Sequence, residues 1–415
     1  MWLLLLMICV MPFEQSPYLM IADSFLGIFQ DFTVIKALGL VGCGWALLRL
    51  ASGNTDEEGI LTSLQAKLFV SFFAGVIVSS LLSGSGFLIV SKYLAFLFFL
   101  PFVLVSVKTQ DDLRRVLYAM AGTLILIFPY AYRQSLRFGD RLGVGLSETN
   151  YFAANLVLVL PLAFAIALQQ RTPGGRRMWL LGSGVLLLEI FLTSSRGGFL
   201  GLLAAGMVFV TRRRGFGAAF TLAAAMIAAI VVLPTDLGQR ALATIGGAEP
   251  PPGLEQSNMA HTALFWAGFR MIAAAPLWGV GPFNFKSLSG YYSGLDISFM
   301  AHNTYLEVAA ELGIPVFVIF VSLLLVALGA FGRASRLHGS PEAEELAGWG
   351  EGLRAGFVGF AVAGTFISAE YEKYFWVVIF LSIVVDRLIR RREAVAAAAA
   401  DVPATEPTAA LAPTR

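Results

Sequence analysis

Long apolar runs, separated by charged residues or by glycine and proline, follow one another along most of the chain. A transmembrane helix needs about 20 mostly apolar residues, and many of these runs come close to that length. The runs lie at about 1–12, 33–51, 68–83, 85–107, 113–132, 151–169, 178–193, 198–211, 215–233, 314–332, 353–369 and 374–389. This pattern predicts an all-α polytopic integral membrane protein with about twelve transmembrane helices. The first run is short, and residues 17–30 could form an interfacial helix beside it.

Lysine and arginine set the expected orientation, because cytoplasmic loops carry an excess of both. With both termini in the cytoplasm, the inner side receives most of the clustered basic residues, namely Arg49, Lys67, Lys108, Arg114, Arg115, Arg171, Arg176, Arg177, Arg212, Arg213, Arg214, Arg333, Arg336, Arg354, Arg387, Arg390, Arg391 and Arg392. The largest polar segment, about 234–312, is then an external loop. The spacing of Phe265 and Phe269 predicts an amphipathic helix over 259–275 that lies on the membrane.

Composition narrows the class of protein further. Of the 415 residues, 57% are apolar and 13% are charged, and a water-soluble chain of this size could not bury so much apolar surface. A soluble enzyme, a secreted disulfide scaffold and a nucleic-acid-binding protein are therefore excluded as primary interpretations. Cys9 and Cys43, the only cysteines, lie in apolar runs without zinc-site spacing. The Ala-, Pro- and Thr-rich residues 393–415 predict a disordered cytoplasmic tail after a transmembrane domain over 1–392.

Four arginines fall on the expected outer side, against the positive-inside pattern. Arg133, Arg137 and Arg141 share one external loop, and Arg196 lies in another, very short one. A single external arginine can simply be solvated or contact lipid headgroups. Four together favour an anionic ligand reached from the outer leaflet, because guanidinium binds phosphate through two parallel charge-assisted hydrogen bonds.

Arg196 stands at the start of a predicted span, in the segment Ser194-Ser195-Arg196-Gly197-Gly198. It would project beside a helix N-terminus, whose free N–H groups also favour anions. The two glycines would allow a bulky substrate to approach closely. The alternative is an arginine that only marks the membrane interface by extending its head group into water.

Two of the three histidines lie on the expected outer side. His302 precedes Thr304-x-x-Glu307, a capping-box pattern that predicts a helix N-terminus. There the imidazole could act as a general base, or it could only fix the loop through hydrogen bonds. His261, near the start of the amphipathic helix, could equally be an exposed residue of its polar face. Glu307 is interpreted as a cap, and together with Glu311 it does not form a recognisable metal site.

Three of these segments resemble motifs of one family. Residues 194–201 (SSRGGFLG) resemble the Ser-Arg-Gly-Gly segment of O-antigen ligases and related polysaccharide polymerases. Residues 301–313 (AHNTYLEVAAELG) are similar to the His-Asn-x-Tyr-Leu box of that family, and residues 276–282 (PLWGVGP) are similar to its Pro-x-x-Gly-x-Gly stretch. The motif core covers about 150–330, and the order, spacing and common external side of the motifs make their combination specific.

The resemblance implies a membrane glycosyltransferase that moves a glycan from an undecaprenyl-pyrophosphate carrier to an acceptor hydroxyl, at the periplasmic face of a bacterial inner membrane. In the ligases the acceptor is the lipid A core, and in the polymerases it is another carrier-linked repeat unit. Arg196 would hold the pyrophosphate and His302 would deprotonate the acceptor, with no metal or other cofactor. The residues expected to bind substrate beside them are Ser195, Asn303, Arg133, Arg137 and Arg141.

One position departs from the family pattern. Counting back from Pro276 to the place of a second family arginine gives His261. Arg270, a little under two helical turns before the proline, is an alternative second contact for the phosphates. The choice between His261 and Arg270 is left open by the sequence.

An O-antigen ligase in lipopolysaccharide assembly is the leading interpretation, and an O-antigen or exopolysaccharide polymerase is the alternative, because the motifs do not separate the two. A lipid-linked oligosaccharide flippase or other transporter is the rival class. Transporters usually show paired halves and charged residues at mid-membrane depth, whereas the unusual residues here cluster at the external ends of spans. The expected partners are the carrier-linked donor, the acceptor and membrane lipids, without nucleic acid.

Overall fold

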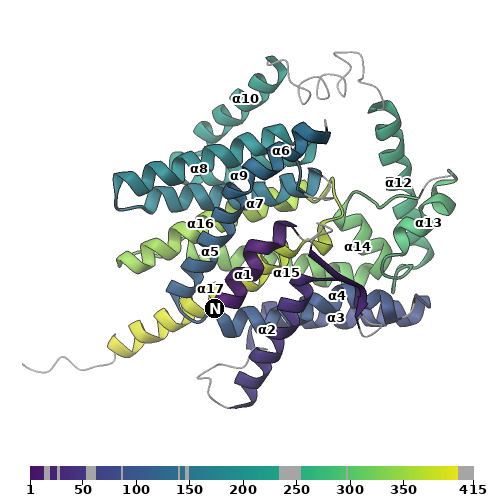
Figure 1. Cartoon of the computed structure of the whole chain (residues 1–415), viewed down its shortest axis with the longest axis horizontal. Helices are drawn as coiled ribbons and strands as arrows, with labels where there is room; N and C mark the ends of the chain where they lie inside the picture. The colour runs from purple at the N-terminus through teal and green to yellow at the C-terminus, as the bar shows by residue number, and fades with distance from the viewer. Residues whose placement is uncertain are drawn as a thin grey trace, which may run out of the picture.

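The apolar runs form helices in the computed structural model, which describes residues 1–13, 19–25, 29–52, 62–85, 87–138, 141–144, 149–232, 254–295 and 298–400 (Figure 1). These helices are α1 (Trp2–Val10), α2 (Val34–Ala51), α3 (Leu64–Ser83), α4 (Phe87–Ser106), α5 (Gln110–Leu126), α6 (Phe128–Phe138), α7 (Thr149–Gln169), α8 (Pro173–Leu192), α9 (Arg196–Arg214), α10 (Phe216–Val232), α15 (Ile314–Ala334), α16 (Pro341–Ala363) and α17 (Lys373–Ala400). Single 3₁₀ turns occur at η1 (Met11–Phe13) and η4 (Ala369–Tyr371).

The segment predicted to be external carries three further helices, α12 (Leu254–Ala274), α13 (Asn284–Ser293) and α14 (Thr304–Leu312). In Figure 1, α12 and α13 gather at one end of the bundle, next to α14. The predicted amphipathic helix over 259–275 is thus confirmed as a helix, although it begins earlier, at Leu254. The first part of the predicted loop, 234–253, lies outside the described residues.

Five helical segments in the described part of the chain are long and apolar enough to cross a membrane on their own. They are Val34–Ala51, Leu64–Ser83, Gln110–Phe138, Thr149–Gln169 and Ile314–Ala334. Each reaches the length of about 18–20 residues that a bilayer core requires. These helices support the all-α membrane fold, and the count of twelve spans stays a prediction.

The predicted interfacial helix over 17–30 is wrong. The chain forms an antiparallel hairpin there, from β1 (Met20–Phe25) and β2 (Phe29–Thr33). Gly27 stands between the two strands in the sequence, and glycine favours a hairpin connection but disfavours a helix interior by about 1 kcal/mol. Isoleucine and phenylalanine around it also favour extended structure.

The last helix is longer than the apolar run within it. The predicted disordered tail starts at residue 393, whereas α17 continues to Ala400, because the alanines at 394 and 396–400 are strong helix formers. Residues 401–415 lie outside the described residues. The domain boundary at 392 stays a prediction.

Glycines bring α7, α9 and α16 into close contact. A Cβ added at Gly201 would lie 2.6 Å from the carbonyl oxygen of Gly359, and one added at Gly352 would lie 2.7 Å from the Cα of Leu162. Small residues of this kind let helix backbones approach one another within membranes. The three helices form a close-packed layer, and Arg196 is the first residue of α9 at its edge.

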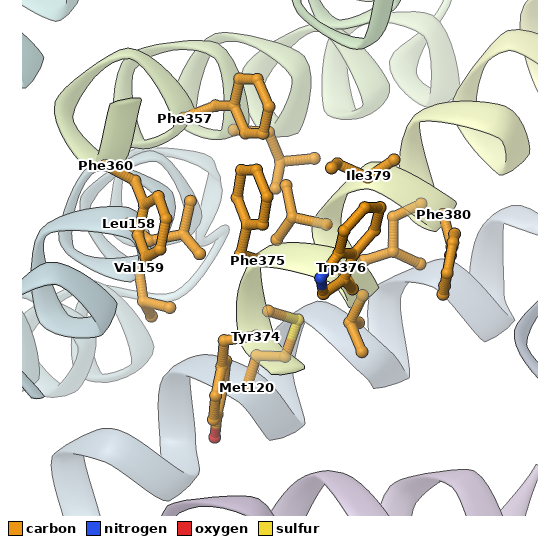
Figure 2. Packing of buried hydrophobic residues seen from close by; sticks show 14 of the residues in the cluster. Met120, Leu158, Val159, Phe357, Phe360, Tyr374, Phe375, Trp376, Ile379 and Phe380 are labelled. Carbon is orange, nitrogen blue, oxygen red and sulfur yellow. The ribbon is translucent and has the colours of Figure 1, made fainter. Parts of the chain in front are cut away.

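Aromatic side chains of α16 and α17 pack together in the buried hydrophobic core (Figure 2). Phe375 stacks against Phe357 and Phe360, with ring centroids 5.8 and 5.0 Å apart and nearly parallel planes. The neighbouring Trp376 is fully buried, and its Nε1–H donates to the backbone carbonyl of Glu370 at 2.7 Å. This core therefore holds the segment between α16 and α17, including η4, against the rest of the bundle.

Candidate functional site

A tight turn between α8 and α9 presents Arg196. Ser194 has a φ of 49°, in the left-handed region that non-glycine residues rarely adopt. Ser195 is the N-cap of α9, and its Oγ accepts the N–H of Gly198 at 3.1 Å. The same hydroxyl donates to Oδ1 of Asn150 at 2.8 Å. The predicted helix N-terminus at half-buried Arg196 is confirmed, and Ser195 serves as its cap.

The two glycines after Arg196 face packed protein. A Cβ at Gly197 would lie 2.8 Å from the Cβ of Phe366, and one at Gly198 would lie 2.7 Å from the Cβ of Ala153. The predicted approach of a bulky substrate at these glycines is therefore wrong for these two positions. They allow α9 to pack on α7 and on the chain after α16.

Arg133 and Arg137 do not lie in a loop, as predicted, but on α6, one helical turn apart and exposed. The guanidinium carbon of Arg137 lies 5.6 Å from the ring centroid of Phe138. The prediction failed because α6 follows α5 almost directly and alternates apolar and polar residues at helical spacing. These two arginines remain accessible to an anionic substrate.

Arg141 has a supporting position, separate from α6. Its Nε donates to the backbone carbonyl of Thr193 at 2.7 Å, and its Nη2 donates to Oδ1 of Asn150 at 3.1 Å. Asn150 is also the partner of Ser195. Arg141 therefore ties the turn that carries Arg196 to the start of α7.

His302 occupies a strained backbone position directly before α14. Its φ is 49°, and a left-handed conformation costs a non-glycine residue about 1–2 kcal/mol. Asn303 is the N-cap of α14, and its Oδ1 accepts the N–H groups of Tyr305 at 3.1 Å and Leu306 at 3.0 Å. The predicted helix N-terminus after His302 is confirmed, and the structure gives Asn303 a capping contact.

Thr304 is not the cap that the capping-box pattern predicted. Its N–H donates to the carbonyl of Gly364 at 2.9 Å, and its hydroxyl donates to the carbonyl of Ile367 at 2.7 Å. The hydroxyl also accepts the N–H of Ala369 at 2.8 Å. Because these contacts engage Thr304, the cap moves to Asn303. We call this set of hydrogen bonds between Thr304 and residues 364–369 the clasp.

His261 and His302 lie edge to face, with ring centroids 5.2 Å apart and planes inclined by 63°. Loss of hydration around the ring, the neighbouring His302 and the positive charge of Arg196 lower the pKa of His261. The structure thus places His261 of α12 against His302 in the turn before α14, and the charge of Arg196, at the start of α9, reaches His261. We call Arg196, His261 and His302 the Arg–His–His site.

Arg270 lies away from this site. Nine residues separate it from His261 along α12, which corresponds to about 13 Å and half a turn of rotation. Its Nη1 donates to the carbonyl of Tyr292 at the end of α13, at 2.6 Å. The geometry therefore favours His261 over Arg270 as the neighbour of Arg196, and Arg270 links α12 to α13.

The Pro-x-x-Gly-x-Gly stretch clamps the end of α14. The N–H groups of Val280 and Gly281 donate to the carbonyls of Ala310 and Glu311, both at 2.9 Å. Gly279 has a φ of 73°, and a Cβ there would overlap the Glu311 carbonyl. Only glycine fits such an approach. The motif is therefore explained by the positioning of α14, the helix that follows His302.

Sequence reasoning missed a buried carboxylate cluster behind His302. Glu307, Glu311 and Glu370 are each 1% exposed. Glu307, predicted to complete a capping box, instead accepts the N–H of Ala301 at 3.2 Å and the hydroxyl of Ser368. In the described part of the chain, no group of His, Cys, Asp or Glu side chains is arranged to hold a metal ion. The i, i+4 spacing indicated two of the carboxylates, but nothing near Glu370 in the sequence indicated the third.

Backbone strain is concentrated around the same region. Ser194, Phe283 and His302 are the only non-glycine residues with positive φ among those described. Ser194 and His302 flank the Arg–His–His site, and Phe283 stacks on Tyr371 with ring centroids 4.5 Å apart. Strained residues persist only where the surrounding structure holds them in place, and they cluster at functional sites.

Residues 181–321 match the family described as O-Antigen ligase. This segment is about a third of the 415-residue chain and includes every member of the Arg–His–His site. No curated protein matches the chain. The resemblance predicted from the motifs is confirmed over residues 181–321 of this membrane protein, which match the O-antigen ligase family.

Proposed function

We propose that the chain is a bacterial inner-membrane glycosyltransferase that moves a glycan from undecaprenyl pyrophosphate to an acceptor hydroxyl at the periplasmic face. The observation that carries this proposal is the convergence of Arg196, His261 and His302 within the segment that matches the family. A fixed cation at a helix N-terminus and two imidazoles suit a reaction in which a diphosphate leaves and a hydroxyl loses its proton.

Arg196 would bind the diphosphate and stabilise the negative charge that develops as the bond from the anomeric carbon to the phosphate oxygen breaks. Its position at the first residue of α9 adds the helix N-terminal N–H groups to this stabilisation. The electron pair of the broken bond leaves with the diphosphate. The acceptor oxygen forms the new bond to the anomeric carbon.

His302 would take the proton of the acceptor hydroxyl. Its strained backbone, the Asn303 cap and the clasp hold the ring at a fixed place beside His261. A positioned general base contributes about 100- to 10,000-fold to a rate. Arg141 would support the turn that carries Arg196 through its hydrogen bond to Thr193. The exposed Arg133 and Arg137 would attract the anionic donor.

His261 would stand in for the second arginine of the family pattern. It lies next to His302, and the field of Arg196 reaches it. As an imidazolium it would contact the second phosphate, whereas Arg270 is held at Tyr292. The leading acceptor is the lipid A core, which makes the protein an O-antigen ligase that completes lipopolysaccharide.

The test is a reconstituted assay with an undecaprenyl-pyrophosphate-linked repeat unit as donor and lipid A core as acceptor. Donor binding and transfer are measured separately. His302→Ala should lose about 100-fold or more in transfer rate while binding of the donor is retained. Arg196→Ala should lose both, because removal of a desolvated charge partner costs about 2–5 kcal/mol. Arg196→Lys should restore only part of the donor binding and transfer, since an ammonium cannot form two parallel hydrogen bonds to a phosphate.

His338→Ala is the matched control, because this exposed histidine lies between α15 and α16, outside the proposed site. It should leave binding and transfer unchanged. A near-normal rate for His302→Ala with an inactive His261→Ala would assign the base to His261. Transfer to a second carrier-linked repeat unit, with none to lipid A core, would identify a polymerase in place of a ligase.

A further inference from the structure

Glu370 has a buried carboxyl group to which no other described residue donates a hydrogen bond. The residue is 1% exposed, and both carboxyl oxygens lack a hydrogen-bond partner among the described residues. Its carboxyl group lies within hydrogen-bonding reach of Glu307. Two carboxylates cannot hydrogen-bond to each other, because both are acceptors only. A single proton on Glu370 removes the conflict, since a protonated carboxyl group can donate to Glu307.

The groups that face Glu370 favour this protonated form. They are Glu307 and Glu311 of α14, Tyr93 of α4, and Tyr371 of η4. Burial and the two neighbouring carboxylates raise the pKa of Glu370 well above its ordinary value. On the same segment, Glu372 accepts from Nδ2 of Asn155 at 2.9 Å and so has its own partner.

Glu311 has a different environment from Glu370. Its carboxylate oxygens accept the N–H groups of Phe283 and Phe285 at 2.8 and 2.9 Å, and the hydroxyl of Tyr371 at 3.3 Å. It therefore serves as the cap of α13. The pair relevant to His302 is Glu307 with Glu370.

The carboxyl pair of Glu307 and Glu370 is connected to His302 through the backbone of the preceding residue. Oε2 of Glu307 accepts the N–H of Ala301, the residue directly before His302, and also the hydroxyl of Ser368. The positive φ of His302 costs a non-glycine residue about 1–2 kcal/mol, so these contacts at Ala301 help to hold it in place. A second negative charge beside Glu307 would repel it and loosen this support.

We propose that Glu370 is held as a neutral acid that donates to Glu307, and that this shared proton positions the backbone of His302. Glu370 is thus a positioning residue, and its ionisation at alkaline pH withdraws the support. This inference rests on the proposed function for its kinetic readout, but the proton itself can be observed without any transfer reaction.

The test compares wild type with Glu370→Gln, whose amide can donate to Glu307 but cannot ionise. Infrared difference spectra at neutral pH should show that the carbonyl band of a protonated carboxyl group is present in wild type and reduced in Glu370→Gln. At saturating donor concentration, transfer by wild type should decline at alkaline pH, whereas Glu370→Gln should keep its rate there and match wild type at neutral pH. Glu370→Ala should lower kcat at least tenfold with the KM for the donor unchanged.

Glu342→Gln is the matched control, because this exposed glutamate lies in the first turn of α16. It should change neither the band nor the pH profile. An unchanged carbonyl band in Glu370→Gln overturns the proposal. The proposal also fails if the transfer rate of Glu370→Gln declines at alkaline pH as much as that of wild type, or is tenfold lower than wild type at neutral pH. A wild type that shows the band but transfers no glycan refutes the proposed function and leaves the proton on Glu370 established.

Discussion

The role proposed for His261 at the diphosphate predicts that donor binding depends on pH. Loss of hydration, His302 and Arg196 lower the pKa of His261 in the free protein, so the ring is neutral at neutral pH. A bound diphosphate reverses the balance, because an opposite charge within about 4–6 Å favours the charged form of a group by about 1–3 pKa units. Binding should therefore take up as much as about one proton at this ring.

The pKa of His261 in the free protein and its pKa with donor bound determine how donor affinity changes with pH. Below the pKa of the free protein, His261 is already charged and affinity is highest. Between the free and the bound pKa, affinity falls about tenfold for each pH unit, because one unit corresponds to 1.36 kcal/mol. Above the bound pKa the ring is neutral in both states and affinity is constant. A shift of about 1–3 units thus predicts a total loss of about 10- to 1,000-fold.

The assay is titration calorimetry with a prenyl diphosphate that carries a sugar on its second phosphate. Such a disubstituted diphosphate has no group of its own that titrates near neutrality. The measured enthalpy should depend on the ionisation enthalpy of the buffer, which reports the proton uptake. His261→Arg should bind without uptake and keep its affinity at alkaline pH, and His261→Gln should bind weakly throughout.

His302→Gln is the control for the neighbouring ring, and it should preserve the proton uptake. A wild-type affinity that stays constant between about pH 5 and 8, the range over which histidines titrate, would refute the reasoning. Equal proton uptake by His261→Arg and wild type would assign the proton to another group.

Three other outcomes follow from the structure. Gly279→Ala should destabilise the protein by about 1–3 kcal/mol, measured as thermal unfolding in detergent, and Gly294→Ala should cost less, since it has a similar φ but open space. Arg141→Ala should weaken donor binding about tenfold or more, because the Arg196 turn loses a charge-assisted support, and a binding assay that finds wild-type affinity would contradict this role. Arg133→Ala and Arg137→Ala should each weaken binding less than tenfold, and the loss should disappear at high salt if they act only through their field.

The sequence predicted the helices, and two of the helix starts in the candidate site, for clear physical reasons. Apolar runs of bilayer length have few alternatives to helices, and Arg196 and His302 stood at predicted helix starts that the structure confirms. The interfacial helix over 17–30 failed because a short apolar segment with a central glycine suits a hairpin as well as a helix. Local pattern does not decide between them.

The contacts that position the site join residues far apart in the sequence, so the local sequence pattern could not predict them. Thr304 has the right spacing for a cap, but its hydroxyl is engaged by Ile367 and Ala369, more than sixty residues further along the chain. Glu370 joins Glu307 across a similar separation. The glycines after Arg196 were interpreted as space for substrate, because a sequence does not show which helix will fill the gap. Distant partners of this kind appear only when the chain is folded.

The clasp also has a consequence for the order in which the protein matures. The support for His302 comes from residues 364–369, which leave the ribosome about sixty residues after His302 itself. During synthesis, the turn at Arg196 therefore leaves the ribosome long before the residues that support His302. An incompletely inserted chain could capture a carrier lipid but would have no fixed base with which to release its glycan. The proposed base would therefore be held in position only after α16 and the chain behind it are synthesised and packed.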